Sequence, residues 1–238
     1  MANLGYVQVT RRCNQCCLFC SNPELDVDLE LPSAVARIDE LAEAGYQGVI
    51  LTGGEPTLHP ELPAMIAHAV ASGLPPRIVT NGQRIGAEPG LGPALAEAGL
   101  AHVHLSLYSH RRDVVAALTG VAESFDRAWA ALEHLERLQP AVSVDLNAVI
   151  NRANADHLDG LVRAVVGRFG FVRHVVFNNL DPFMNRVAEH PETVPRLWAF
   201  ELSLHRALRW LQAGGRSFRV ERVPLCYMTG FAHASTET

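Results

Sequence analysis

Short apolar segments alternate with longer segments of helical periodicity along the chain. The apolar segments are typical of strands and fall at residues 6–10, 48–52, 77–80, 102–107, 142–149 and 174–178. The segments between them predict helices at residues 32–44, 60–72, 93–98, 124–138 and 155–168, several with proline in the first turn or glycine after the last. Strands that alternate with helices form parallel sheets, so we predict an α/β fold with a curved, barrel-like sheet.

The pattern changes after residue 178. A proline-interrupted segment, LDPFMNRVAEHP, is expected to be a loop, and it precedes a long predicted helix at 194–212 and a last strand at 218–223. We find no linker long enough to separate two independent domains. We therefore expect a core of residues 1–180 and a helical and short-strand C-terminal extension, residues 181–238, packed on the core.

Several predicted strands alternate between polar and apolar residues instead of being apolar throughout. In HVHLSL, Ser106 shares a face with two histidines, and in VSVDLNAV, Asn147 shares a face with a serine and an aspartate. If the apolar faces pack on helices, the polar faces point into the barrel, which would then hold water or a polar ligand. The alternative is that some of these are edge strands with one solvated face.

Composition and charge exclude some classes of protein. The chain has 238 residues, of which 48% are hydrophobic and 19% charged, and its formal net charge is -5. This charge gives no support to general nucleic-acid binding. No apolar run approaches the roughly 18 residues of a membrane span, and the start, MANLGYVQVT, lacks the features of a signal peptide. We expect a cytoplasmic protein without a membrane partner.

The segment CNQCCLFC, residues 13–20, contains four of the five cysteines. It can be divided into two Cys-x2-Cys pairs, as in a zinc site, although zinc ribbons separate their pairs widely. A redox dithiol, either Cys13 with Cys16 or Cys17 with Cys20, is a second interpretation. A third is Cys-x3-Cys-x2-Cys with one cysteine left over.

Polar and glycine-containing turns follow the next two predicted strands. TGGEPT begins at Thr52, and TNG occupies residues 80–82. Adjacent glycines allow the backbone to approach a ligand closely, and Glu55 can accept hydrogen bonds from a cationic group. Parallel α/β proteins place their active sites at the carboxyl ends of their strands, so these turns are candidate site segments.

The sequence resembles the radical S-adenosylmethionine (SAM) enzymes. The resemblance is carried by CNQCCLFC, then GGEPTLHPEL from Gly53, TNG, and LSLYS from Leu105, with TGVAESFDRAWAALEHL and VDLNAVINRAN in the later part. It covers residues 6 to 178 and implies a partial (β/α)6 barrel of parallel strands.

The resemblance also implies the cofactors and the residues that bind them. Cys13, Cys17 and Cys20 would be the thiolate ligands of one 4Fe–4S cluster, with Cys16 as the surplus cysteine. The open fourth iron would bind the amino and carboxylate groups of SAM. The SAM contacts implied are Phe19 near the adenine, Gly54 and Glu55 at the amino group, Thr80 and Ser106 at the carboxylate or ribose, and Asn147 at the ribose or adenine.

The activity implied is reductive cleavage of SAM to a 5′-deoxyadenosyl radical that abstracts hydrogen from a peptide or a small metabolite. Such an enzyme would be oxygen-sensitive, an oxidoreductase or transferase, and would need an electron donor such as flavodoxin or ferredoxin. No side chain is identified as catalytic in the substrate reaction. The alternative is a non-catalytic iron–sulfur or SAM-binding scaffold. Cys226 stands apart from the other cysteines, and we expect it to be a buried thiol.

Overall fold

The computed structural model describes residues 3–22 and 25–237. Their contacts divide the chain into two compact units, each of which combines segments that are far apart in the sequence. The first unit comprises the described residues within 1–14, 22–105 and 127–144, and the second those within 15–21, 106–126 and 145–238. The expected division into residues 1–180 and 181–238 stays a prediction.

Parallel strands in chain order form the sheet of the first unit. Its strands are β1 (Gly5–Thr10), β2 (Val49–Gly53), β3 (Pro76–Thr80) and β4 (His102–Ser106) up to Leu105. Val7 pairs with Leu51, which pairs with Ile78, and each of these side chains is at most 1% exposed. A row of buried apolar side chains therefore crosses the sheet and fixes the register of its strands.

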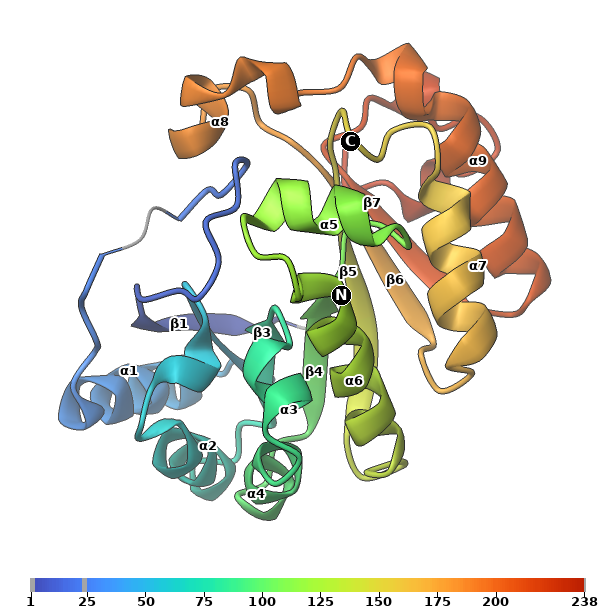
Figure 1. Ribbon diagram of the computed structural model, residues 1–238. Coiled ribbons are helices and arrows are strands. Elements are labelled where there is room, and N and C mark those ends of the chain that lie inside the picture. The colour runs from blue at the N-terminus through green and yellow to red at the C-terminus, as the bar shows by residue number, and fades with distance from the viewer. Residues whose placement is uncertain (1–2, 23–24, 238) are drawn as a thin grey trace. The chain divides into compact units, whose positions relative to one another are not determined.

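Helices follow the strands of this unit. They are α1 (Leu31–Glu43), α2 (Leu62–Ala71), α3 (Gln83–Ala87) and α4 (Leu91–Glu97). Both α1 and α2 have a proline in the first turn, where no intrahelical partner for its nitrogen is required. Each helix buries apolar residues, among them Ile38 in α1 and Met65 in α2. Figure 1 shows α1, α2 and α4, in blue to green, beside the strands that they cover.

The second unit contains most of β5 (Ser143–Ile150), together with β6 (His174–Asn179) and β7 (Ser217–Glu221). β6 pairs in parallel with both β5 and β7. The last strand, expected as part of an extension, thus continues the parallel pairing of its unit. The helices here are α5 (Arg112–Thr119), α7 (Leu158–Arg168), α8 (Asn185–Glu189) and α9 (Leu197–Ala213).

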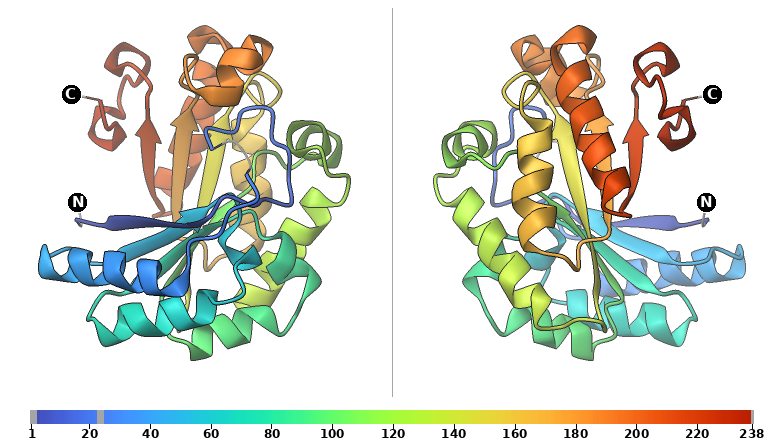
Figure 2. Two further views of the ribbon diagram at one scale, coloured as in Figure 1. Left: turned by 90° about the vertical axis from the view of Figure 1, so that its left-hand side faces the viewer. Right: turned by 90° about the vertical axis from the view of Figure 1, so that its right-hand side faces the viewer.

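Helices α7 and α9 pack side by side (Figure 2, right). Leu161 and Val165 of α7 and Leu204 and Leu208 of α9 are fully buried. At the edge of these helices, Arg206 of α9 forms an ion pair of 3.2 Å with Asp159 of α7. Apolar burial supplies most of the stability of such a pair, because an exposed ion pair contributes at most about 1 kcal/mol.

The α/β class and the strand positions predicted from the sequence are confirmed, but several short helices were missed. LDPFMNRVAEHP was expected to be a loop, whereas it contains α8 and a 3-10 turn, Pro191–Thr193. Helices α3 and α5 were also not predicted. These helices have five to eight residues, which is too short for a helical period to be recognised.

Among the residues that the structure describes, no helix has both the length and the apolar character needed to cross a membrane.

Candidate functional site

The two glycines after β2 are required by the protein's own backbone. The amide of Gly54 donates to the carbonyl of Thr10 at 2.9 Å, and the amide of Glu55 donates to that of Arg12 at 2.8 Å. A Cβ atom at Gly53 would overlap the carbonyl oxygen of Thr10, and one at Gly54 would overlap that of Arg12. In the structure these glycines allow the chain after β1 to approach; that they also let the backbone approach a ligand stays a prediction.

Glu55 is fully buried and accepts hydrogen bonds from four neutral groups. Its Oε1 accepts from the Thr57 amide at 3.1 Å, the Thr57 hydroxyl at 2.6 Å and the Thr80 hydroxyl at 2.7 Å. Its Oε2 accepts from the Asn81 amide at 2.7 Å. Burial raises the pKa of Glu55 even though these hydrogen bonds act to lower it. A cation brought to this carboxylate would favour its ionised form.

Asn81 connects Glu55 to the first cysteine. While its amide donates to Glu55, its side-chain Nδ2 donates to Asn14 Oδ1 at 2.8 Å and lies 3.9 Å from Cys13 Sγ. Gly82 adopts a positive φ of 74°, which lets the turn place Asn81 in this position. The motif TNG marked this turn in the sequence, but nothing in it identified Asn81 as the link.

Residues 15–21 belong to the second unit and are held by α5. The amides of Cys16 and Leu18 donate to the carbonyls of Thr119 and Leu118, at 2.9 and 3.2 Å. These carbonyls lie in the last turn of α5, where no intrahelical donor remains for them. The end of α5, a helix that the sequence did not predict, therefore fixes the backbone of the cysteine segment.

The cysteines of this segment differ in environment. Cys16 is exposed, Cys20 is partly buried, and Cys17 is only 8% exposed. Cys17 lies in an apolar cluster, here called the aromatic cluster, and Cys20 packs against it. Its buried members are Cys17, Phe19, Tyr108, Val114, Leu118, Leu180 and Val187. All five cysteines of the chain lie within the described residues and are thiols outside any disulfide.

Phe19 and Tyr108 form the aromatic contact of this cluster. Their ring centroids are 4.8 Å apart and the rings are nearly perpendicular, at 83°. This edge-to-face arrangement is favourable because it brings the positive edge of one ring to the negative face of the other. The orientation of Phe19, a candidate adenine contact, thus depends on Tyr108.

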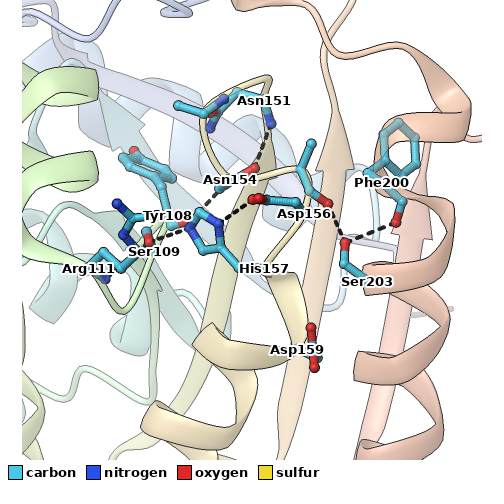
Figure 3. Close-up of polar contacts among 12 residues, drawn as sticks. Tyr108, Ser109, Arg111, Asn151, Asn154, Asp156, His157, Asp159, Phe200 and Ser203 are labelled. Atoms are coloured by element: carbon cyan, nitrogen blue, oxygen red, sulfur yellow. Dashed lines mark hydrogen bonds and ion pairs between the residues drawn. The ribbon is translucent and has the colours of Figure 1, made fainter.

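A polar network that is buried at Ser109 and Asn154 and reaches the surface at Asp156 holds the backbone at Tyr108 (Figure 3). Asn154 donates from Nδ2 to the Tyr108 carbonyl at 2.6 Å. Ser109 Oγ lies 2.8 Å from His157 Nε2, and His157 Nδ1 lies 2.6 Å from Asp156 Oδ1. This connectivity is that of a hydrolase triad, but a nucleophilic serine must be reachable and Ser109 is 0% exposed. The network therefore anchors the chain after β4 and does not form a hydrolytic site.

Ser106 and Asn147, both candidate SAM contacts, are brought together in the second unit. Asn147 Nδ2 donates to Ser106 Oγ at 3.3 Å, and its Oδ1 accepts from Asn178 Nδ2 at 2.6 Å. A polar row thus extends from Ser106 through β5 to β6. The two-residue period of the strands identified the first two members. Asn178 also lies in a predicted strand but was not identified as a site residue.

One expectation about the cysteines is wrong. Cys226 was expected to be a buried thiol, but it is exposed in a 3-10 turn, Leu225–Tyr227. The turn follows Pro224, and its own residues include none that are buried. A turn of this length has no face to bury, so the apolar character of cysteine does not decide its position here.

Parallel strands alternating with helices, cysteines directly after β1 and a buried glutamate directly after β2 define an α/β protein with candidate ligand-binding residues after its first two strands. The family is shown by comparison with known proteins: the model of the radical SAM superfamily matches residues 7–165. The chain belongs to the radical SAM superfamily.

Relatives and solved structures agree with this family. The chain is 34% identical to PqqA peptide cyclase of Methylocella silvestris over 170 residues, which cover 67% of this chain and 43% of the relative. It is 33% identical to Fe-coproporphyrin III synthase of Methanosarcina barkeri over 150 residues, covering 61% and 36%. The chain thus spans less than half the length of these curated relatives.

The structure is similar to that of Streptococcus suis SuiB bound to S-adenosylmethionine. The TM-score is 0.74 at 16% identity, and the likeness covers 92% of this chain and 50% of SuiB. SuiB bound to its precursor peptide SuiA gives a TM-score of 0.72 at 16% identity, covering 94% and 50%. At this identity the likeness shows the fold alone, and it confirms the fold class predicted from the sequence.

Proposed function

We propose that this chain contains the core of a radical SAM enzyme, with Cys13, Cys17 and Cys20 as the ligands of one 4Fe–4S cluster. The observation that carries the proposal is the family match over residues 7–165, which includes the Cys-x3-Cys-x2-Cys spacing. The donor set fits the cluster, because iron–sulfur clusters are held by thiolates and these cysteines are thiols outside any disulfide.

The environment of Cys16 supports its role as the surplus cysteine. Its side chain is exposed and is not part of the aromatic cluster, and its backbone amide is bound by α5. A zinc site using all four cysteines of residues 13–20 would require Cys16 as a ligand. The family spacing and the exposure of Cys16 both favour the three-ligand interpretation.

The proposed SAM contacts are Phe19, Gly54, Glu55, Thr80, Ser106 and Asn147. Glu55 is a buried carboxylate whose four hydrogen-bond donors are neutral. The ammonium group of SAM would supply a positive charge that lowers the pKa of Glu55 and favours its ionised form. Thr80 donates to Glu55 and accepts from the Gly82 amide at 3.0 Å, which would hold this carboxylate in place. Phe19 offers an aromatic surface for the adenine, and Ser106 and Asn147 offer polar groups for the ribose.

When bound, the cluster would supply the electron that cleaves SAM to a 5′-deoxyadenosyl radical, which takes hydrogen from the substrate. The chain's own contribution is to hold the thiolates, orient the SAM ammonium at Glu55 and pack Phe19 in a water-poor cluster. An electron donor such as flavodoxin or ferredoxin would deliver the electron in the cytoplasm.

A peptide is the substrate class that we favour. Support comes from the similarity to PqqA peptide cyclase and from the fold shared with SuiB, which has been solved with a precursor peptide. The similarity to Fe-coproporphyrin III synthase favours a small molecule as the second candidate. A non-catalytic scaffold remains the alternative from another class, and Glu55 together with the three cysteines argues against it.

The test is anaerobic reconstitution with iron and sulfide, followed by incubation with SAM and dithionite. We expect about four irons per chain, as one 4Fe–4S cluster requires, and formation of 5′-deoxyadenosine. A reconstituted cluster that leaves SAM intact would favour the scaffold, and zinc in place of iron would contradict the proposal. Short peptides encoded beside the gene, if found, would be made in deuterated form, and transfer of deuterium from one of them into 5′-deoxyadenosine would identify the substrate class.

A further inference from the structure

Three buried polar side chains connect the cysteine segment to the end of α5 and the start of α6 (Ser124–Glu136). Gln15, Thr119 and Ser124 are 6%, 0% and 1% exposed. Gln15 Nε2 donates to Ser124 Oγ at 3.1 Å, and Ser124 Oγ lies 2.8 Å from Thr119 Oγ1. Thr119 Oγ1 in turn donates to the Val115 carbonyl within α5 at 2.8 Å.

The other end of the Gln15 carboxamide faces a proposed cluster ligand. Cys17 Sγ lies 3.5 Å from Gln15 Oε1, so the thiol donates to the amide oxygen. The aromatic cluster, which contains Cys17, is otherwise built from apolar side chains. Burying a carboxamide beside it is costly unless both ends of the amide are hydrogen-bonded. This arrangement suggests a role for Gln15 beyond filling space.

The contact must change when the Cys17 sulfur is bound to iron. An iron-bound sulfur has no proton to donate, so the amide oxygen, 3.5 Å away, would face a second acceptor. Rotation of the terminal amide by about 180° exchanges oxygen and nitrogen while occupying the same space. Ser124 tolerates both orientations, because its hydroxyl can accept from the amide nitrogen, or donate to the amide oxygen while it accepts from Thr119 Oγ1.

We propose that Gln15 is a positioning residue that donates an N–H···S hydrogen bond to the Cys17 sulfur of the loaded cluster, with Ser124 holding the amide. The inference rests on the proposed function, since it needs Cys17 as a ligand. Hydrogen bonds to the sulfurs are among the factors that set the potential of an iron–sulfur cluster. A donor stabilises the more negative, reduced state, so Gln15 raises the midpoint potential.

The experiment measures the midpoint potential of the reconstituted cluster by redox titration followed by electron paramagnetic resonance, without SAM. Gln15→Leu removes the donor at similar size and should lower the potential. Gln15→Glu keeps the shape but adds a negative charge, and should lower it further. Ser124→Ala leaves the donor but releases its anchor, so a smaller shift in the same direction is expected.

Ser203→Ala is the matched control, because Ser203 is a buried serine of α9 at 2% exposure that hydrogen-bonds the Phe200 carbonyl. It should cost stability and leave the potential unchanged. Unchanged potentials in Gln15→Leu and Gln15→Glu, with full iron content, would overturn the inference. If both Gln15 variants fail to take up iron, Ser124→Ala decides: a lowered potential supports the inference and an unchanged one overturns it. A wild-type protein that binds no cluster would instead overturn the proposed function and, with it, this inference.

Discussion

The turn after β2 and the cysteine segment at residues 15–21 hold their candidate residues by opposite means. Glu55 is fixed by four directional hydrogen bonds from neutral donors. The side chain of Cys17 is held largely by apolar packing with Phe19 and other members of the aromatic cluster, and Gln15 is a polar neighbour of its sulfur. A charged group needs donors at defined angles, whereas a thiol that is later bound by a metal needs mainly a pocket of the right volume.

The difference teaches where each region tolerates substitution. In the turn after β2, a change of charge should weaken ligand binding even when the side chain keeps its size. An added Cβ atom at a glycine there should reduce stability. In the second region, changes that keep size and apolar character should be tolerated, unless they remove a thiol ligand. Four predictions follow this contrast from the largest effect to the smallest.

The largest effect is expected from the cysteines. Cys17→Ala should abolish the visible absorption of the reconstituted cluster, because one of three thiolate ligands is lost. Cys16→Ala is the matched control and should keep the absorption, since this side chain is exposed and outside the aromatic cluster. Absorption spectra after anaerobic reconstitution distinguish the two. Loss with Cys16→Ala and retention with Cys17→Ala would mean that the ligands are wrongly assigned.

Glu55→Ala should weaken SAM binding about tenfold or more while the cluster remains assembled. A hydrogen bond between charged groups contributes about 1.5–3 kcal/mol, and each 1.4 kcal/mol corresponds to about a tenfold change in affinity. Glu55→Gln keeps much of the shape but removes the charge and replaces one accepting oxygen with an N–H donor, so it should weaken binding in the same direction. Anaerobic calorimetry of SAM binding checks both variants. An affinity equal to that of the wild type in both would exclude Glu55 as the partner of the ammonium group.

Gly54→Ala should reduce the free energy of unfolding by about 1–3 kcal/mol or more, because its Cβ would overlap the Arg12 carbonyl, a backbone atom that cannot turn aside. Gly167→Ala in α7 is the control. Among the described residues, no neighbouring atom lies within 4 Å of a Cβ at this position. This substitution should stabilise the protein by about 0.4–1 kcal/mol. Urea unfolding of the cluster-free protein measures both; equal effects would contradict the close approach at Gly54.

The smallest effect is expected for the aromatic pair. Phe19→Leu and Tyr108→Leu should show a coupling energy of about 0.5–1.5 kcal/mol in a double-mutant cycle of unfolding, in addition to the burial that each loses. Tyr108→Phe keeps the ring and should retain the coupling to Phe19. A coupling energy near zero would show that the contact between the two rings adds no stability beyond the burial of each ring.

Local patterns determined much of the fold and of the candidate site. Each strand of residues 6–178 was predicted because a short apolar or alternating segment can be recognised within one stretch of sequence. The same two-residue period put Asn147 on the polar face of its strand, and Asn147 does contact Ser106. The cysteine spacing and the glycine-glycine-glutamate turn were equally local, and they identified the family before any contact was known.

Tertiary structure decided what depends on contacts between distant residues. Helix α5 is too short to stand out in the sequence, yet its last carbonyls hold the cysteine segment. Glu55 was expected beside a cation, and only the fold surrounds it with neutral donors, including Thr80, 25 residues away. Gln15 and Ser124 are 109 residues apart. Ser124 begins a predicted helix, but no local pattern indicates its contact with Gln15, because a hydrogen bond across that separation exists only once the chain between them has folded.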